Sequence, residues 1–256
     1  MTIEKLKAYK IFKGETLLSL KLLKNQGYCN INYRLKTSQK SYLIRTFKRD
    51  ETVNINREFE FKTQQKAYKK KLAAQPLFLN SDENFMVCEF LKGKHKKSIC
   101  IQEIKQLGKM VKKLHSIKSD EKPYDFKKAL MPYKKALNSQ EARKSIHICQ
   151  RELNSLNKHK KIWVTTHHDL NPRNILFHKK SIKFIDWEYA GVNDAFFDLA
   201  TLCFEFGFNK KEEKVLLKSY QNKTNKKDIH KLHSYMVLYK HICKLWFMHL
   251  VSTSQN

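Results

Sequence analysis

The sequence predicts an α+β fold with two lobes: a small β-rich lobe at the N-terminus, then a mainly helical lobe that carries a β-hairpin. Short strand-like segments occupy residues 16–90 around a single helical stretch. Apolar residues then recur at helical spacing over much of residues 101–252. Within this second part, two short apolar segments joined by a polar turn predict the hairpin.

The N-terminal lobe, residues 1–92, is expected to form a small sheet with one helix. From Asn56 the sequence has helical character, and Pro76 breaks it. Apolar and β-branched residues between polar turns predict the strands, which we place in residues 16–24, 25–35, 42–47, 78–80 and 85–90.

The second lobe, residues 93–256, is expected to begin at a hinge near Gly93. In residues 101–117 large aliphatic side chains recur every three or four positions, as on the buried face of an amphipathic helix. Residues 119–160 read as a charged, helical connection without a recognisable motif. Further helices are predicted at residues 194–206, 211–221 and 228–252.

Length and cysteine usage limit the class of protein. A chain of 256 residues can bury a substantial core, as one large domain or two packed lobes. Its six cysteines include no Cys-x-x-Cys pair, which argues against a zinc site or a disulfide framework and for a reducing compartment. Residues 1–12 lack the apolar segment of a signal peptide, and residues 235–251 are too short and too charged to span a bilayer. We therefore expect a cytoplasmic protein without a transmembrane segment.

The formal net charge of +28 would suit nucleic acid or an anionic membrane. However, 45 of the 52 basic residues are lysines, and they are spread from end to end. Arginine, the favoured residue for bidentate recognition of phosphates and bases, occurs only seven times. We therefore expect no specific nucleic-acid partner. A non-catalytic basic protein that binds nucleic acid or membrane is kept as the distant alternative.

The most informative segment lies between residues 167 and 189. It begins with His-His-Asp-Leu-Asn-Pro-Arg-Asn, ending at Asn174, and finishes with Ile-Asp-Trp-Glu-Tyr, which contains Asp186. The intervening residues predict a hairpin whose ends meet, so that Asn174 comes to lie beside Asp186. Asp169, just before the loop, is then expected across from this pair.

This arrangement resembles the catalytic loop and metal-binding aspartate of kinase-fold phosphotransferases. The resemblance implies a two-lobed protein-kinase-like fold, ATP as co-substrate and Asp169 as the catalytic base. It also implies that Asn174 and Asp186 hold Mg²⁺, an ion that prefers oxygen ligands. Neither His167 nor His168 is expected to ligate a metal, because adjacent side chains rarely converge on one ion.

Over most of its length the chain resembles the choline/ethanolamine kinase family, and within it the bacterial choline kinases. Thiamine kinases and aminoglycoside phosphotransferases are more distant relatives of the same core. The resemblance is specific in the catalytic segment and in three places of the N-terminal lobe. These three places imply a set of nucleotide-binding residues: Gly27, Asn30, Asn32, Arg45, Glu60, Glu89 and Leu91.

Each of the three places has a role in the family that it resembles. Residues 27–33 are similar to the nucleotide loop, although with a single glycine, and residues 87–91 to the hinge strand that contacts adenine. Arg45 stands at the position of the basic residue that contacts the nucleotide and pairs with a helix carboxylate. The carboxylate is expected to be Glu60, with Glu58 as the alternative.

The resemblance implies a small amino alcohol as the phosphate acceptor, most directly choline. A quaternary ammonium ion cannot donate a hydrogen bond, so its site needs aromatic faces and carboxylates. Trp187 is expected in the core and Asp198 beneath the catalytic loop, while His249 replaces the second tryptophan of the family's Leu-Trp-x-x-Trp helix. The expected substrate-binding residues are Asn171, Tyr189, Glu205 and Trp246.

Other acceptors stay open at this point. Ethanolamine and thiamine are both cationic alcohols, and Ile-Asp-Trp-Glu-Tyr-Ala-Gly is also typical of thiamine kinases. Aminoglycosides fit less well, because polycationic sugars call for an acidic cleft and the helical lobe is rich in lysine. The oligomeric state is left open.

Overall fold

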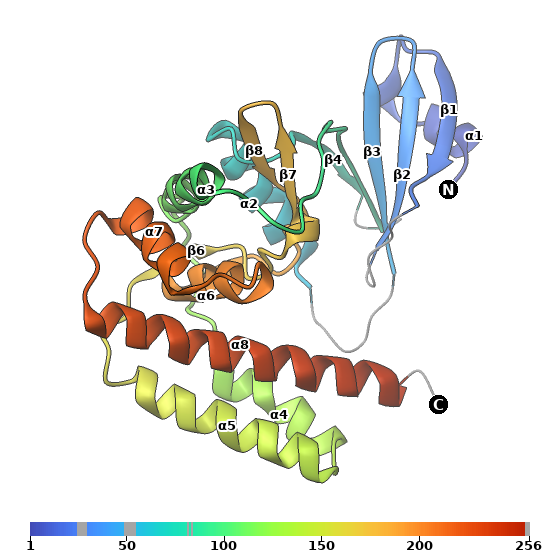
Figure 1. Cartoon of the computed structure of the whole chain (residues 1–256). Helices are drawn as coiled ribbons and strands as arrows, with labels where there is room; N and C mark the ends of the chain where they lie inside the picture. Colours follow the sequence, from blue (N-terminus) through green and yellow to red (C-terminus); the bar gives the residue numbers. More distant parts are fainter. Residues whose placement is uncertain (25–29, 49–54, 81, 83, 254–256) are drawn as a thin grey trace. The chain divides into compact units, whose positions relative to one another are not determined.

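The computed structural model describes residues 1–24, 30–48, 55–80, 82 and 84–253. The chain forms two compact units (Figure 1). The first unit comprises Met1–Lys94 with Leu176–Tyr189, and the second comprises His95–Ile175 with Ala190–Asn256. The predicted hairpin therefore makes its contacts within the first unit, although its sequence lies inside the predicted helical lobe. The functional division into lobes 1–92 and 93–256 stays a prediction.

A small sheet was predicted for the N-terminal lobe, and an antiparallel five-stranded sheet forms the centre of the first unit. Its order is β1-β2-β3-β5-β4, so β5 pairs with β3 and β4 forms the edge beyond β5. The strands are β1 (Leu17–Leu22), β2 (Asn30–Thr37), β3 (Ser41–Phe47), β4 (Pro76–Asn80) and β5 (Phe85–Glu89).

The two faces of this sheet are covered by different elements. Successive side chains of a strand point to opposite faces, and on one of them Tyr42 and Ile44 join a core with the N-terminal residues Leu6 and Phe12. Those residues lie in α1 (Ile3–Lys7) and the short 3₁₀ helix η1 (Lys10–Phe12), which the sequence analysis did not predict. The opposite face packs against α2 (Arg57–Lys69), whose Phe61 joins the second core cluster.

The hairpin of β7 (Ile175–His178) and β8 (Ser181–Phe184) is tied to the first unit by backbone hydrogen bonds. The Phe184 amide donates to the Leu72 carbonyl at 2.7 Å, and Lys94 and Phe177 exchange bonds of 2.9 and 3.0 Å. Gly93 allows the approach, since a Cβ there would lie 3.1 Å from the Cβ of Leu176. These contacts explain why a hairpin far along the sequence groups with the N-terminal residues.

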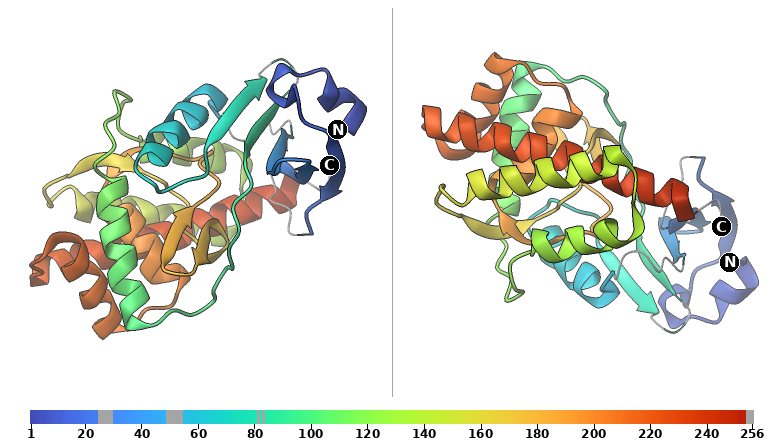
Figure 2. Two further views of the ribbon diagram at one scale, coloured as in Figure 1. Left: turned by 90° about the horizontal axis from the view of Figure 1, so that it is seen from above. Right: turned by 90° about the horizontal axis from the view of Figure 1, so that it is seen from below.

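The second unit is mainly helical, which confirms the predicted α+β class. In the views of Figures 1 and 2, α8 runs beside α5, with which it packs. A two-stranded sheet of β6 (Trp163–Thr166) and β9 (Gly191–Asp194) was not predicted. The helices are α3 (Ile101–Leu114), α4 (Phe126–Ala136), α5 (Gln140–Leu156), α6 (Phe196–Glu205), α7 (Lys210–Gln221) and α8 (Lys226–Thr253).

Helix α6 forms the centre of this unit. Every residue from Phe196 to Cys203 is buried, as expected for a helix that is apolar on almost all sides. Asp198 is the one charged residue in this buried stretch, so its carboxylate needs partners. No described helix in either unit is long and apolar enough to cross a membrane.

Candidate active site

The catalytic loop of the second unit holds the Asp169 carboxylate by both of its oxygens. Asn171 Nδ2 donates to Oδ1 at 2.8 Å, and Asn174 Nδ2 donates to Oδ2 at 2.7 Å. The 3₁₀ helix η2 (Pro172–Asn174) supplies this geometry, because Asn171 caps it by accepting the Arg173 amide and Asn174 ends it. The loop therefore presents an oriented carboxylate, as a group that accepts a hydroxyl proton requires.

Asp198 supports the loop from beneath, as predicted. Its Oδ2 accepts the His167 amide at 2.8 Å, and its Oδ1 accepts the His168 amide at 2.9 Å. His168 needs this support because its φ of +67° lies in the left-handed region that side chains rarely adopt.

A further layer of side chains fixes Asp198 itself. His115 Nε2 lies 3.1 Å from Asp198 Oδ2, and His115 Nδ1 lies 2.9 Å from the Tyr220 hydroxyl. Burial alone would raise the pKa of Asp198, but the hydrogen bond and charge of His115 outweigh it and the net shift is downward. The chain of contacts links α3, α6 and α7 to the catalytic loop.

In the first unit, two arginines, three carboxylates and one asparagine form a network of side-chain contacts. Arg45 Nη1 contacts Glu60 Oε1 at 2.5 Å, and its Nη2 contacts Asp186 Oδ1 at the same distance. Glu60 is thus the helix carboxylate that meets Arg45, whereas the Glu58 side chain is 69% exposed and pairs with Lys62. We call this group the arginine–carboxylate cluster; its members are Asn30, Arg45, Arg57, Glu60, Asp186 and Glu188.

Arg57 forms the second half of the cluster. Its Nη1 lies 2.8 Å from Glu60 Oε2 and 3.1 Å from Glu188 Oε2, and its Cζ lies 3.9 Å from the centroid of the Phe47 ring. Asn30 Nδ2 donates to the same Glu188 oxygen at 2.8 Å. The Glu188 carboxylate is therefore engaged inside the first unit.

Asp186 is the member of the cluster that is open to a ligand. Its side chain is 28% exposed, against 6% for Glu188 and 0% for Glu60. Burial, followed by the charge of Asp186, raises the pKa of Glu188 to about 7. Two guanidinium groups and three carboxylates leave the cluster with one excess negative charge when all are ionised.

This donor set fits a divalent cation at Asp186. The excess carboxylate charge would be compensated by a cation, and oxygen ligands suit Mg²⁺. Among the described residues no group of three His, Cys, Asp or Glu side chains could hold a metal on its own. Mg²⁺ is usually bound by one or two carboxylates and completes its shell with phosphate oxygens and water.

The other expected nucleotide-binding residues take varied positions in the first unit. Asn32 lies opposite Arg45 in the β2–β3 ladder, so the two residues share a face of the sheet. Glu89 ends β5 with an exposed side chain, and Leu91 packs against the second core cluster. Gly27 lies outside the described residues.

The expected substrate residues are divided between the units. Tyr189, half-buried, ends the first unit, while Glu205 and Trp246 belong to the second. Glu205 accepts a hydrogen bond of 2.9 Å from the Tyr239 hydroxyl. Trp187 is fully buried, as predicted, and its indole donates to the Phe184 carbonyl at 3.2 Å.

In the second unit, Tyr239 is influenced electrostatically by both Glu205 and Asp169. Burial raises its pKa, and the charges of Cys243, Glu205 and Asp169 raise it further. Both carboxylates therefore act on one aromatic residue. On α8, Cys243 follows Tyr239 by four positions and Trp246 by seven, so all three lie on one stripe of the helix.

Sequence reasoning missed four of these residues: Tyr239, Cys243, His115 and Tyr220. The helical spacing before Trp246 was a signal that pointed to Tyr239. His115 and Tyr220 had none, since their contact depends on how three helices pack.

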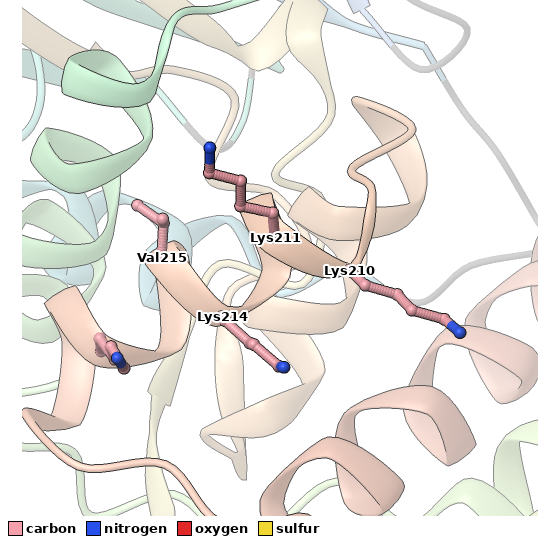
Figure 3. A pocket seen from close by; sticks show the side chains of 5 residues that line it. Lys210, Lys211, Lys214 and Val215 are labelled. Atoms are coloured by element: carbon pink, nitrogen blue, oxygen red, sulfur yellow. The ribbon is translucent and has the colours of Figure 1, made fainter.

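A surface hollow on α7 has a different character (Figure 3). Its lining residues include no carboxylate or hydroxyl group, and Lys211 extends away from Lys210 and Lys214 in the figure, so the ammonium groups do not converge. The hollow is part of the general excess of lysine. Its lining residues are Lys210, Lys211, Lys214, Val215 and Lys218.

Comparison with known proteins identifies the family. The model described as the phosphotransferase enzyme family matches residues 23–227, most of the chain. The chain belongs to this phosphotransferase family. The phosphotransferase is 28% identical over 212 residues to protein LicA of Haemophilus influenzae, an alignment that covers 78% of the chain and 62% of the relative. It is 25% identical over 243 residues to a LicA homologue of Mycoplasma capricolum, covering 93% of each.

Solved structures share the fold of the phosphotransferase. The choline kinase LicA from Streptococcus pneumoniae has a TM-score of 0.82 at 20% identity, covering 99% of this chain and 92% of that one. A choline/ethanolamine kinase family protein from Mesorhizobium loti has a TM-score of 0.79 at 20% identity, covering 98% and 85%. A LicA in complex with AMP has a TM-score of 0.75 at 20% identity, covering 95% and 87%. The kinase-like fold, the resemblance to choline/ethanolamine kinases and the prediction of an ATP-dependent phosphotransferase are confirmed.

Proposed function

We propose that this phosphotransferase transfers the γ-phosphoryl group of ATP to the hydroxyl of a small amino alcohol, with choline as the main acceptor. The observation that carries the proposal is the Tyr239–Glu205 pair. Its hydrogen bond of 2.9 Å joins the Glu205 carboxylate to the hydroxyl of an aromatic side chain, and the charge of Asp169 raises the pKa of the same hydroxyl. An aromatic face beside carboxylates, close to the catalytic aspartate, is what a cationic alcohol needs.

Asp169 acts as the proton acceptor of the substrate hydroxyl. The two amide hydrogen bonds to its carboxylate hold one orientation. Phosphoryl transfer proceeds through a loose transition state, so positioning matters more than base strength. In this proposal Asn171 orients the base and also borders the acceptor, and Tyr189 and Trp246 supply further aromatic faces.

Asn174 and Asp186 would hold Mg²⁺, which would neutralise charge on the phosphates when bound. Asn174 directly precedes β7, and Asp186 follows β8 by two residues, so they flank the same hairpin. Arg45 contacts the nucleotide phosphates and is oriented by Glu60. We assign the adenine and phosphate contacts to Asn30, Asn32, Glu89, Leu91 and, outside the described residues, Gly27. The expected cytoplasmic location stays a prediction.

Initial rates of Mg²⁺-dependent ADP release, with choline, ethanolamine, thiamine and kanamycin supplied separately, test the acceptor. We expect the highest kcat/KM with choline. The Asp169→Asn variant serves as the blank that is subtracted from each rate. A clear preference for thiamine or kanamycin would contradict the proposed acceptor. A preference for ethanolamine would keep the class and discard choline.

The acceptor pocket can be tested with Tyr239→Phe, which keeps the ring and removes the hydroxyl that holds Glu205. We expect KM for choline to rise several-fold with KM for ATP unchanged, because the lost hydrogen bond contributes about 1 kcal/mol. Tyr68→Phe, on the exposed side of α2, is the matched control. An unchanged KM for choline would remove Tyr239 and Glu205 from the pocket.

A further inference from the structure

Arg57 has no role in the chemistry described so far, yet it is the most connected residue of the arginine–carboxylate cluster. One nitrogen, Nη1, faces Glu60 Oε2 and Glu188 Oε2, and the other, Nη2, lies 3.4 Å from Asn30 Oδ1. Its Cζ lies over the Phe47 ring, 3.9 Å from the ring centroid. Its side chain is only 16% exposed, so these contacts are made largely out of water.

Arg57 contacts two residues that are linked to Asp186 or its neighbour in sequence: Glu188 and Asn30. Glu188 lies two residues after Asp186, and Trp187 between them is anchored by its fully buried indole. Asn30, the first residue of β2, also donates to Glu188. The backbone at Asp186 has a φ of +64°, a conformation that an aspartate keeps only when its surroundings hold it.

We propose that Arg57 is a positioning residue that clamps Glu188 and thereby fixes the Asp186 backbone for magnesium–nucleotide binding. This inference rests on the proposed function. Arg45 contacts Asp186 directly, whereas Arg57 acts on it through Glu188. Glu60 keeps the two arginines apart and oriented, because each of its oxygens takes one guanidinium.

Lysine cannot replace Arg57 in this role. The planar guanidinium presents several N–H groups at fixed angles, so that one side chain reaches Glu60, Glu188 and Asn30 together. An ammonium group is a point donor and would keep the charge without the clamp. Residues that orient a metal ligand from behind typically contribute about 10- to 100-fold to metal affinity or activity.

Binding of ADP, measured by titration calorimetry with Mg²⁺ and with EDTA in its place, tests the proposal without turnover. The ratio of the two Kd values gives the gain in affinity due to magnesium. We expect Arg57→Lys and Glu188→Gln each to lose about tenfold or more of this gain, with the magnesium-free Kd unchanged. The double variant should lose no more than the worse single variant, because both changes open one clamp.

The control is Arg151→Lys, an exposed arginine that pairs with its neighbour Glu152 and should keep the wild-type gain. Thermal melts of each variant verify folding, and the isosteric Glu188→Gln preserves the measurement should Arg57→Lys not fold. The clamp would be overturned if both single variants kept the wild-type gain in ADP affinity due to magnesium. It would also be overturned if the losses of this gain in the two single variants multiplied in the double variant. A wild-type protein that binds no ADP would overturn the proposed function and this inference with it.

Discussion

Asp169 shows how much of the proposed chemistry depends on single atoms. Its two carboxylate oxygens are taken by the side-chain amides of Asn171 and Asn174, which act as donors only toward a carboxylate. The same geometry that orients a proton acceptor also limits which substitutions it tolerates. An amide at position 169 has one oxygen and one nitrogen, so it would face one donor with another donor.

The Asp169→Asn variant should fold and bind ATP but turn over slowly, because an amide side chain cannot take up the hydroxyl proton. We expect kcat to fall by about 10²- to 10⁴-fold, the usual contribution of a general base, with the Kd for ATP within twofold of wild type. Rapid-quench measurement of the phosphoryl-transfer step and calorimetric titration with ATP check the two parts. A kcat near that of the wild-type protein would remove Asp169 from the role of base.

Glu60 and Glu58 form a natural pair for a stability measurement. Glu60 is buried between two guanidinium groups, whereas Glu58 lies on the exposed side of the same helix. Glu60→Gln breaks the two buried ion pairs that Glu60 makes with Arg45 and Arg57, and we expect it to lower the free energy of unfolding by about 3–5 kcal/mol. Glu58→Gln should change it by less than about 0.5 kcal/mol. Urea denaturation of both variants measures these changes in the free energy of unfolding. Equal changes for Glu60→Gln and Glu58→Gln would contradict the burial of Glu60.

At the scale of elements, the close packing of α3 on α7 depends on Gly108. A Cβ at this position would lie 2.8 Å from Ser219 Cβ and 2.9 Å from the Leu216 carbonyl oxygen. Neither atom is the end of a flexible chain, so the helices would have to move apart. We expect Gly108→Ala to destabilise the protein by about 1–3 kcal/mol, despite alanine's higher helix propensity. Urea denaturation of this variant checks it, with the exposed Lys109→Ala as control; a stabilised variant would contradict the packing.

The contact of three helices around Asp198 predicts a pH dependence. Burial opposes ionisation of Asp198, but His115 and the loop amides lower its pKa below that of an unfolded aspartate. A lowered pKa contributes stability that is fully present above about pH 4 and is lost as the pH falls through the native pKa. Asp198→Asn should therefore show a flatter dependence of unfolding free energy on pH below about 4. Denaturant titrations at several pH values measure the slopes, and parallel curves would contradict the shift.

Elements of the fold were predictable where a local pattern sets them. The helices of residues 101–117, 211–221 and 228–252 were found because aliphatic residues recur at helical spacing, and the hairpin because its turn is polar. The pairing of β6 with β9 was missed, since the two strands are four residues long and far apart in sequence. The N-terminal helix α1 was missed because one buried residue, Leu6, carries its packing.

The candidate site also contains residues that could be predicted from the sequence and residues that could not. Asp169, Asn174 and Asp186 could be chosen because their spacing is fixed by a loop and a hairpin close in sequence. The choice between Glu58 and Glu60 required the register of α2 against β3, which a sequence pattern one turn long does not specify. The part played by Arg57 and Asn30 emerges only from tertiary contacts across the first unit.

At the scale of the whole molecule, the net charge of +28 predicts weak, unspecific attraction to polyanions. Lysines occur from end to end of the sequence, and those around the α7 hollow do not converge. We expect any binding to duplex DNA to be independent of sequence and to fall steeply between 50 and 200 mM salt, by roughly 10³-fold or more if several phosphates are contacted. Fluorescence anisotropy with two unrelated sequences tests this, and salt-resistant binding of one of them would contradict it.

The central claim is that a small amino alcohol receives the phosphoryl group, and identification of the product tests it most directly. Phosphorus NMR of the protein incubated with ATP, Mg²⁺ and choline distinguishes a phosphomonoester of choline from inorganic phosphate. We predict one new phosphomonoester signal that grows in step with ADP and is absent with the Asp169→Asn variant. ADP accompanied only by inorganic phosphate, or no consumption of ATP, would contradict the claim.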